Sequence, residues 1–289
     1  MGVLNVSPES FHPGSVHTGV DDLLTTALAM VEAGAILIDI GARSTAPYLN
    51  TEITEEEERA RLARAIEALA TKVPVPISAD TSRPVPARAA LDAGARIIND
   101  VSGLRDPVLA SLASEHRVGV ILMASPEASK RSLAATGDAV GVEGARSREA
   151  AAEDARRHDA PVAVVKALLK AALRRATTAG IDEERVVLDP GIGFFRNEAV
   201  PWDEWDARVL AGLGALEDLG RPLCVAVSRK SFIGEIIGHT GTENRLAGSL
   251  AATALAVSNG ASLIRTHDVA ETIDAVRVAE RVRRAAATL

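Results

Sequence analysis

Short apolar runs rich in β-branched residues alternate with helix-length amphipathic segments along the whole chain, and this alternation constrains the fold most strongly. The candidate strands are Gly2–Val6, Ala35–Ile40, Pro76–Asp80, Ala95–Asp100, Gly119–Met123, Val186–Asp189, Leu223–Ser228 and Ser262–His267. The candidate helices are Val20–Glu32, Glu55–Thr71, Pro84–Ala93, Val162–Thr178, Trp202–Leu219, Asn244–Ser258 and Val269–Ala287. Strand runs separated by helix-length segments predict βαβ units and a parallel sheet.

The candidate strands are almost wholly apolar, which is typical of a sheet covered on both faces. Three helices end in a glycine, Gly34, Gly94 or Gly260, which can supply a left-handed C-cap before the next strand. About eight such units predict one α/β domain over residues 1–289, a (β/α)₈ TIM barrel. An open doubly wound sheet is the alternative, but no glycine-rich dinucleotide fingerprint follows the first strand. Residues 124–159 are expected to form a long loop after the fifth strand, either a lid or a partly disordered segment.

Charge and cysteine content exclude several classes of protein. A formal net charge of −7 argues against a nucleic-acid partner, because binding phosphate backbones needs a basic face. Cys224 is the only cysteine, so neither a disulfide within the chain nor a thiolate metal site can form. No apolar run approaches the length of a membrane span, and Met1–Asn5 lacks the features of a signal peptide. We therefore expect a cytoplasmic protein without membrane partners.

Polar residues stand at or near the carboxyl ends of nearly all the candidate strands, where barrel enzymes carry their active sites. These residues are Asn5, Asp39, Asp80 with Thr81, Asn99 with Asp100, Asp189, Ser228-Arg229-Lys230, and Arg265-Thr266-His267-Asp268. The fifth strand, which ends at Met123, is the exception. The pattern predicts a polar ligand site at this mouth of the barrel.

Asp80, Asn99 and Asp189 suggest the kind of ligand. A buried polar group left without a partner costs about 1–3 kcal/mol, so these side chains need donors or acceptors. A pterin-like or guanine-like ring would supply several N–H donors at once. The alternative is that each residue caps a neighbouring helix, which is at least as good an explanation for any one of them alone. For three residues at converging strand ends we favour the ligand.

A basic cluster follows the last two strands. Lys230, Arg265 and His267 would lie beside helix N-termini, where barrel enzymes commonly bind phosphate. The alternative, exposed cations that balance an acidic surface, does not explain why they gather there. The turn Asp189–Phe194 contains two glycines that would let its backbone approach a ligand, although a tight rim turn would need them too.

At these positions the sequence resembles the dihydropteroate synthase family, and the resemblance extends almost from end to end. The matching segments, in chain order, are Gly2–Phe11, Ile38–Gly41 with Ser44–Pro47, Ser78–Thr81, Ile98–Gly103, Asp189–Phe194, Ser228–Gly234 and Arg265–Val269. The resemblance implies a transferase that joins 6-hydroxymethyl-7,8-dihydropterin diphosphate to an arylamine and releases pyrophosphate.

The resemblance also implies roles for individual residues. The pterin ring would be bound by Asp80, Asn99, Met123, Asp189 and Lys230. The catalytic residues would be Asn5, which helps to hold Mg²⁺ and the pyrophosphate, with Lys230, Arg265 and His267, the last two receiving the leaving anion. The arylamine would be bound by Thr45, Pro47, Phe194 and Ser231.

The sequence departs from the family pattern on the arylamine side. Arg43 stands where the family usually has Glu, Ala46 where it has Arg, and Leu122–Pro126 replaces the usual motif after the fifth strand. This pattern is similar to archaeal-type members, in which a ribosylated, phosphorylated arylamine would be the acceptor on the way to methanopterin; 4-aminobenzoate is the other candidate. Arg43 would then contact the acceptor's phosphate, or else face the acidic run Glu55–Glu58.

Two other functions fit a pterin-binding barrel. A methyltetrahydropterin-dependent methyltransferase would not need the anion site at Lys230, Arg265 and His267. A non-catalytic pterin carrier would bind the ring without turnover. We also expect a homodimer, with Leu246–Val257 as the candidate interface and ordinary helix–barrel packing as the alternative for that stretch.

Overall fold

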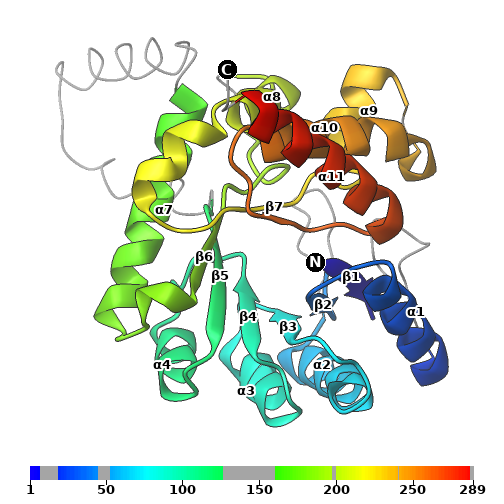
Figure 1. The fold of residues 1–289 in the computed structure, drawn as a ribbon. Helices are drawn as coiled ribbons and strands as arrows, with labels where there is room; N and C mark the ends of the chain where they lie inside the picture. Colours follow the sequence, from blue (N-terminus) through cyan, green and yellow to red (C-terminus); the bar gives the residue numbers. More distant parts are fainter. Residues whose placement is uncertain (7–18, 45–52, 126–159, 197–199, 240, 287–289) are drawn as a thin grey trace, which may run out of the picture.

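The computed structural model describes residues 1–6, 19–44, 53–125, 160–196, 200–239 and 241–286 (Figure 1). Its parallel strands are β1 (Gly2–Asn5), β2 (Ile38–Gly41), β3 (Ile77–Asp80), β4 (Ile97–Asp100), β5 (Gly119–Met123), β6 (Val186–Asp189), β7 (Cys224–Val225) and β8 (Leu263–Ile264). β1 to β6 form one sheet in chain order, and β7 pairs with β8. Single bridges from Leu188 to Leu223 and from Gly2 to Thr266 join these two sheets at both edges. The predicted (β/α)₈ barrel is thereby confirmed.

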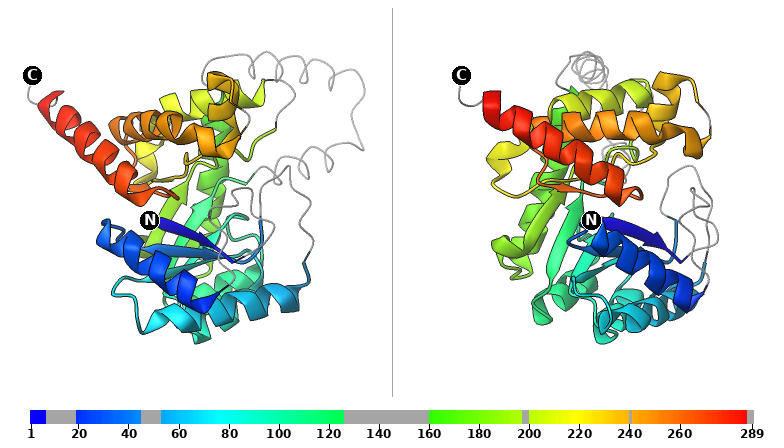
Figure 2. Two further views of the ribbon diagram at one scale, coloured as in Figure 1. Left: turned by 90° about the vertical axis from the view of Figure 1, so that its right-hand side faces the viewer. Right: turned by 45° about the vertical axis from the view of Figure 1, so that its right-hand side comes forward.

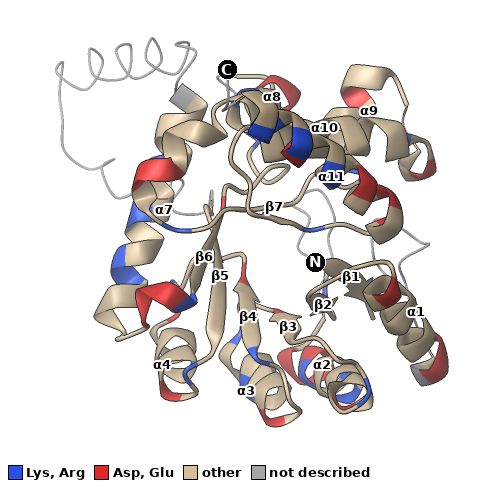
Figure 3. Ribbon diagram, viewed as in Figure 1, with Lys and Arg blue, Asp and Glu red and all other residues tan. Residues whose placement is uncertain are grey.

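Helices cover the outside of the strands in all three views (Figures 1 and 2). They are α1 (Val20–Glu32), α2 (Glu55–Ala70), α3 (Pro84–Asp92), α4 (Pro107–Glu115), α7 (Ala160–Thr178), α8 (Trp202–Ala211), α9 (Ser231–Ile237), α10 (Leu246–Ser258) and α11 (Val269–Ala286). The 3₁₀ turns are η2 (Glu183–Arg185), η3 (Leu213–Leu219) and η4 (Thr242–Arg245). Charged residues lie mostly on these outer elements (Figure 3). Within the described ranges, no helix is long and apolar enough to cross a bilayer.

The strands are short, from two to five residues, and most of their residues are buried in the barrel wall. Met1, Leu37, Ile121 and Cys224 form a small buried cluster apart from the main apolar core. The predicted C-cap glycines have the expected left-handed backbone, with φ of +107° at Gly34, +118° at Gly94 and +105° at Gly260. These turns return each helix to the sheet, so that every strand points its carboxyl end to the same mouth.

Several predicted boundaries were wrong. The segment Trp202–Leu219 is not one helix, because α8 ends at Ala211 and the chain continues as η3. A Cβ on Gly212 would lie 2.4 Å from Cγ2 of Val162 in α7, so the chain bends where two helices approach closely. The expected helix Asn244–Ser258 begins only at Leu246, after η4. Most of the long loop predicted after β5, residues 126–159, lies outside the described residues.

Candidate active site

The strand register places four site positions in one row at the mouth of the barrel. Asn5 pairs with Gly41, Gly41 with Asp80, and Asp80 with Asn99, across β1 to β4. Because these residues are aligned across adjacent parallel strands, they lie at one level of the barrel. Gly41 leaves room in the row, since a Cβ there would lie 3.3 Å from Asn5 Oδ1 and 3.7 Å from Asp80 Oδ2.

Arg265, just after β8, reaches across to this row. Its Nε donates to Asp39 Oδ2 at 2.7 Å, and one terminal nitrogen donates to Asp80 Oδ2 at 2.8 Å. Asn99 Nδ2 donates to the same Asp39 oxygen at 3.2 Å. One guanidinium therefore links the carboxylates of β2 and β3, and the amide of β4 joins them. Asp39 was predicted only as one of the polar strand-end residues and was given no binding or catalytic role, although it is a carboxylate inside the apolar run Ile38–Ile40.

Two carboxylates share the cation of Arg265, and the pKa of Asp80 depends on both of these neighbours. Burial raises the pKa of Asp80 to about 7; the charge of Arg265 lowers it and the charge of Asp39 raises it further. Burial acts to lower the pKa of Arg265, but Asp39 and Asp80 outweigh it and raise that pKa above its usual range. The second oxygens of these carboxylates, Asp39 Oδ1 and Asp80 Oδ1, are buried without a hydrogen-bond partner among the described residues. Such oxygens are strong acceptors for ligand N–H groups.

Asp189 and Lys230 form the other side of the mouth. Burial raises the pKa of Asp189, while the Gly191 N–H, which donates to Asp189 Oδ1 at 2.7 Å, and the charge of Lys230 act in the opposite direction. Burial lowers the pKa of Lys230 to about 8, and the charge of Asp189 opposes this. The buried Met123 is register partner of Asp189. The predicted pterin residues are therefore brought together at this mouth.

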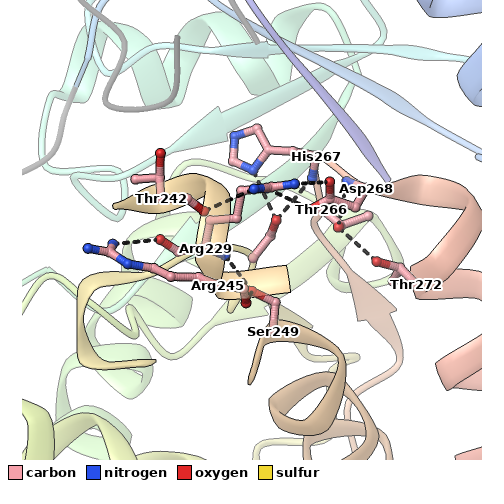
Figure 4. Close-up of polar contacts among 9 residues, drawn as sticks. Arg229, Thr242, Arg245, Ser249, Thr266, His267, Asp268 and Thr272 are labelled. Carbon is pink, nitrogen blue, oxygen red and sulfur yellow. Dashed lines mark hydrogen bonds and ion pairs between the residues drawn. The ribbon is translucent and has the colours of Figure 1, made fainter. Parts of the chain in front are cut away.

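The basic cluster after β7 and β8 divides between different partners (Figure 4). Arg229 makes a two-point ion pair with Asp268 and donates to the Thr242 carbonyl at 2.9 Å. His267 Nδ1 lies 3.0 Å from Ser228 Oγ. Arg229 therefore fixes the two loops to each other, whereas Lys230 and Arg265 turn into the mouth. The roles of Arg265 and His267 toward a leaving anion stay predictions.

The arylamine side is described only in part, because Thr45 and Pro47 lie outside the described residues. Phe194 lies beneath Lys230, whose Nζ is 4.6 Å from the ring centroid. Ser231 Oγ accepts a hydrogen bond of 3.3 Å from Arg196. Phe194 thus contacts Lys230 in space, and Ser231 follows it directly in the chain.

Arg43 faces the acidic run of α2. Of its two predicted roles, contact with an acceptor phosphate or with this acidic run, the structure shows the second. Its Nε donates to Glu58 Oε2 at 3.2 Å. Glu58 is buried and also accepts from Arg83 at 3.0 Å and from Thr81 Oγ1 at 2.6 Å. Arg43 is therefore part of a structural ion-pair network at the rim.

Two of the polar strand ends cap the turn that follows them. Asp100 accepts hydrogen bonds from the backbone N–H groups of Ser102 and Leu104 at 2.8 Å and 2.6 Å. Asp189 does the same for Gly191 through one oxygen. Asp80 and Asn99 instead contact side chains of the mouth, so capping does not explain these two, and their role toward a ligand stays a prediction.

A Mg²⁺ ion could be held at Asn5 together with substrate oxygens. No cluster of three or more His, Cys, Asp or Glu side chains suits a metal within the described ranges. Mg²⁺ commonly takes only one or two protein oxygens and completes its shell with phosphate and water. Asn5 Oδ1 and Asp80 Oδ2 both lie within 4 Å of the Cβ position at Gly41, so hard oxygen donors are concentrated there. The residues present fit this weakly ligated type of site.

Known proteins share this chain's sequence and fold. A family model described as pterin binding enzyme matches residues 1–267. Dihydropteroate synthase of Escherichia coli strain K12 is 36% identical over 280 residues, which cover 97% of this chain and 90% of that protein. Among solved structures, Xanthomonas albilineans dihydropteroate synthase with 4-aminobenzoic acid is 38% identical with a TM-score of 0.79. The Coxiella burnetii dihydropteroate synthase in complex with pteroic acid is 34% identical with a TM-score of 0.80.

Both structural matches cover 98% of this chain and 92% of the other chain. Similarity of this extent and identity includes the whole barrel and both sides of its mouth. The resemblance inferred from the seven motifs is confirmed, and the chain belongs to the family of pterin-binding enzymes, within which its relatives are dihydropteroate synthases.

Proposed function

We propose that this chain is a dihydropteroate synthase that couples 6-hydroxymethyl-7,8-dihydropterin diphosphate to 4-aminobenzoate. The observation that carries the proposal is the pair of buried, unpartnered oxygens Asp39 Oδ1 and Asp80 Oδ1, among the described residues, facing the same mouth as Asp189 and Lys230. A pterin presents ring N–H and amino donors to such acceptors. The site thus has the polarity that recognition of this ring requires.

The reaction breaks one C–O bond and forms one C–N bond. The diphosphate leaves the exocyclic carbon with the bonding electrons, the amine nitrogen attacks that carbon, and the nitrogen then loses a proton to water. The pterin ring is held by Asp80, Asn99, Met123, Asp189 and Lys230. Their work is positioning, which converts a bimolecular encounter into a reaction between aligned groups.

Charge develops on the departing diphosphate, so the chain must supply positive charge and donors there. Arg265 and His267 follow β8 at the mouth and would receive this anion. Asn5 would hold Mg²⁺, which neutralises diphosphate charge when bound. Preorganised groups of this kind stabilise a leaving anion more effectively than water does.

The acceptor site would comprise Phe194 and Ser231 together with Thr45 and Pro47, as the family resemblance implies. Arg43 is engaged by the buried Glu58, which supports an acceptor without a phosphate group. We therefore assign 4-aminobenzoate as the acceptor in preference to its ribosyl phosphate derivative. A homodimer through α10 also belongs to this proposal; Leu255 of that helix is 56% exposed in the single chain, which leaves an apolar side chain for a partner.

Pyrophosphate release tests the proposal directly. The purified chain is incubated with the pterin diphosphate and Mg²⁺, with 4-aminobenzoate, its ribosyl phosphate derivative, or no acceptor. We expect release that depends on 4-aminobenzoate and a pteroate product. Asp189→Asn should weaken pterin binding. Tight pterin binding without acceptor-dependent release would instead indicate the methyltransferase or carrier function.

A further inference from the structure

Asp206 of α8 is a fully buried carboxylate directly behind the turn that follows β6. Its Oδ1 accepts a hydrogen bond of 2.8 Å from the backbone N–H of Gly193. Its Oδ2 is buried and has no hydrogen-bond partner among the residues that the structure describes. Asp203 and Glu204 on the same helix remain partly or largely exposed. A buried carboxylate is costly, so its position inside the helix–barrel interface needs an explanation beyond solubility.

The Gly193 peptide that Asp206 holds is in contact with Lys230. Gly193 has a φ of +87°, and a Cβ there would lie 2.9 Å from Lys230 Cδ and 3.2 Å from its Nζ. The next residue, Phe194, places its ring 4.6 Å from the same ammonium. The Lys230 side chain therefore packs against this turn. The hydrogen bond from the Gly193 N–H to Asp206 holds the turn in position.

The charges around Lys230 come from four elements. Asp189 on β6 and Asp206 on α8 stabilise its ammonium, whereas Arg265 after β8 and Arg196 after the turn oppose it. Asp206 itself is faced by Lys230, Arg196 and Asp203. Burial raises the pKa of Asp206 to about 6, while the Gly193 N–H and the charge of Lys230 lower it. Above that pH, Asp206 supplies a second negative charge close to Lys230.

We propose that Asp206 is a positioning residue for the pterin site: it fixes the Gly193 peptide under Lys230 and places a second carboxylate close to the Lys230 ammonium. This inference rests on the proposed function only in that Lys230 binds the pterin. Asp206 does not touch the substrate in this scheme. It acts through the turn by its hydrogen bond and through Lys230 by its charge.

Two substitutions separate the two contributions. Asp206→Asn keeps a carbonyl oxygen that can accept from Gly193 but removes the charge. Asp206→Ala removes both the acceptor and the charge. Asp203→Asn is the matched control, because it makes the same charge change one turn earlier on the same helix, at a partly exposed side chain.

Titration of the lysine side chains tests the charge contribution without any ligand. The chain has five lysines, so ¹³Cε-lysine NMR of the full chain gives few signals, and Lys230 is assigned by its loss in Lys230→Met. We expect Asp206→Asn to move the Lys230 midpoint to lower pH by roughly half a pH unit, since an opposite charge has been removed. Asp203→Asn should leave it within experimental error. An unchanged midpoint in Asp206→Asn would overturn the charge contribution.

Binding of 6-hydroxymethylpterin tests the hydrogen-bond contribution. At pH 6.5, where Lys230 is protonated in every variant, Asp206→Ala should bind about tenfold more weakly, which is the loss expected for one buried hydrogen bond. Asp206→Asn should bind the pterin as tightly as wild type does at pH 6.5. As the pH is raised, its affinity should fall earlier than that of wild type, because its Lys230 loses the proton at a lower pH. Equal weakening by Asn and Ala at pH 6.5 would overturn the positioning role. If Asp206→Ala does not fold, Asp206→Leu takes its place, because it also removes the acceptor and the charge but fills the space of the side chain. The two Asn variants still decide the charge contribution.

The two proposals fail in different ways. If the wild-type chain bound no pterin, the proposed function would be contradicted, while the Lys230 titration would still report whether Asp206 controls its charge. If wild type binds pterin and releases pyrophosphate but Lys230 titrates identically in Asp206→Asn, only the inference about Asp206 falls.

Discussion

The guanidinium of Arg265 donates from Nε to Asp39 Oδ2 at 2.7 Å, although the two residues are 226 positions apart in the chain. This bond connects the end of β8 to β2 across β1, at the seam where the barrel closes. The same guanidinium contacts Asp80 on β3. The contacts that close the barrel and the polar centre of the mouth therefore share these three residues, and substitutions of Arg265 or of its carboxylate partners should affect both stability and binding.

Replacing Arg265 by Ala should destabilise the protein by about 3–5 kcal/mol, because it leaves the fully buried Asp39 without its cation. The free energy of unfolding from urea titration measures the change. The double variant Arg265→Ala, Asp39→Asn should recover part of the loss, since the uncompensated charge is then gone. A change below about 1 kcal/mol in the single variant would contradict the bridging role.

Stability should fall as the pH rises from about 4 to about 7. The ordinary pKa of Asp80 is 3.8 and burial raises it to about 7 in the folded protein. Between these values the unfolded chain has lost a proton that the folded chain retains, so raising the pH favours unfolding. Urea midpoints at pH 5 and pH 7.5, without added metal, measure this. Asp80→Asn should show a smaller decline than wild type, and equal declines would argue against the raised pKa.

Gly41→Ala should lower pyrophosphate release with little effect on folding. The added methyl group would lie 3.3 Å from Asn5 Oδ1 and 3.7 Å from Asp80 Oδ2, so it fills the space where the substrate's diphosphate and Mg²⁺ are proposed to bind. Gly214→Ala is the control, because a Cβ there meets nothing within 4 Å. Steady-state assays should show reduced kcat/KM for the pterin diphosphate only at Gly41. Equal activity of both variants would place the anion elsewhere.

The barrel could be predicted from the sequence because its signals are local and repeated. Apolar strand runs, helix-length segments and C-cap glycines such as Gly94 each depend on a few neighbouring residues. The carboxyl ends of parallel strands must meet, so Asp80, Asn99 and Asp189 could be grouped without any knowledge of side-chain packing. The break between α8 and η3 could not be predicted, because the bend at Gly212 depends on the close approach of Val162 from α7.

Side-chain contacts between strands on opposite parts of the barrel could not be predicted from the sequence. Asp39 was noted only as polar, and its pairing with Arg265 requires the closed barrel. Asp206 lies in an acidic stretch, 203–206, that resembles a solvated helix face, and only the packing of α8 shows that it is buried. Arg229 directly precedes Lys230 of the basic cluster in the sequence, and only the structure shows that it pairs with Asp268. Helix α4 is absent from the predicted helices, although the sequence carries a local signal for it: Asp106 before Pro107 is a typical N-cap.

Arg229→Lys should destabilise the protein by about 1–3 kcal/mol, although the charge is conserved. A lysine cannot reproduce the two-point contact with Asp268 together with the bond to the Thr242 carbonyl. Thermal and urea unfolding measure the loss. Arg221→Lys, at an outer ion pair with Glu183, is the control and should be close to neutral. Equal effects of the two substitutions would mean that the buried pair contributes no more than a surface pair.

Arg43→Ala should leave the preference for 4-aminobenzoate unchanged. Glu58 holds Arg43 in the structure, and after the substitution it still has Arg83 and Thr81 as partners, so the rim should persist with a modest loss of stability. Competition between 4-aminobenzoate and its ribosyl phosphate derivative in the release assay measures the preference. If Arg43 bound an acceptor phosphate, the substitution would raise KM for the derivative alone, and the ratio of the two kcat/KM values would change. If Arg43 serves only to pair with Glu58, the ratio of the two kcat/KM values should stay constant, and 4-aminobenzoate should react faster than its ribosyl phosphate derivative in both proteins.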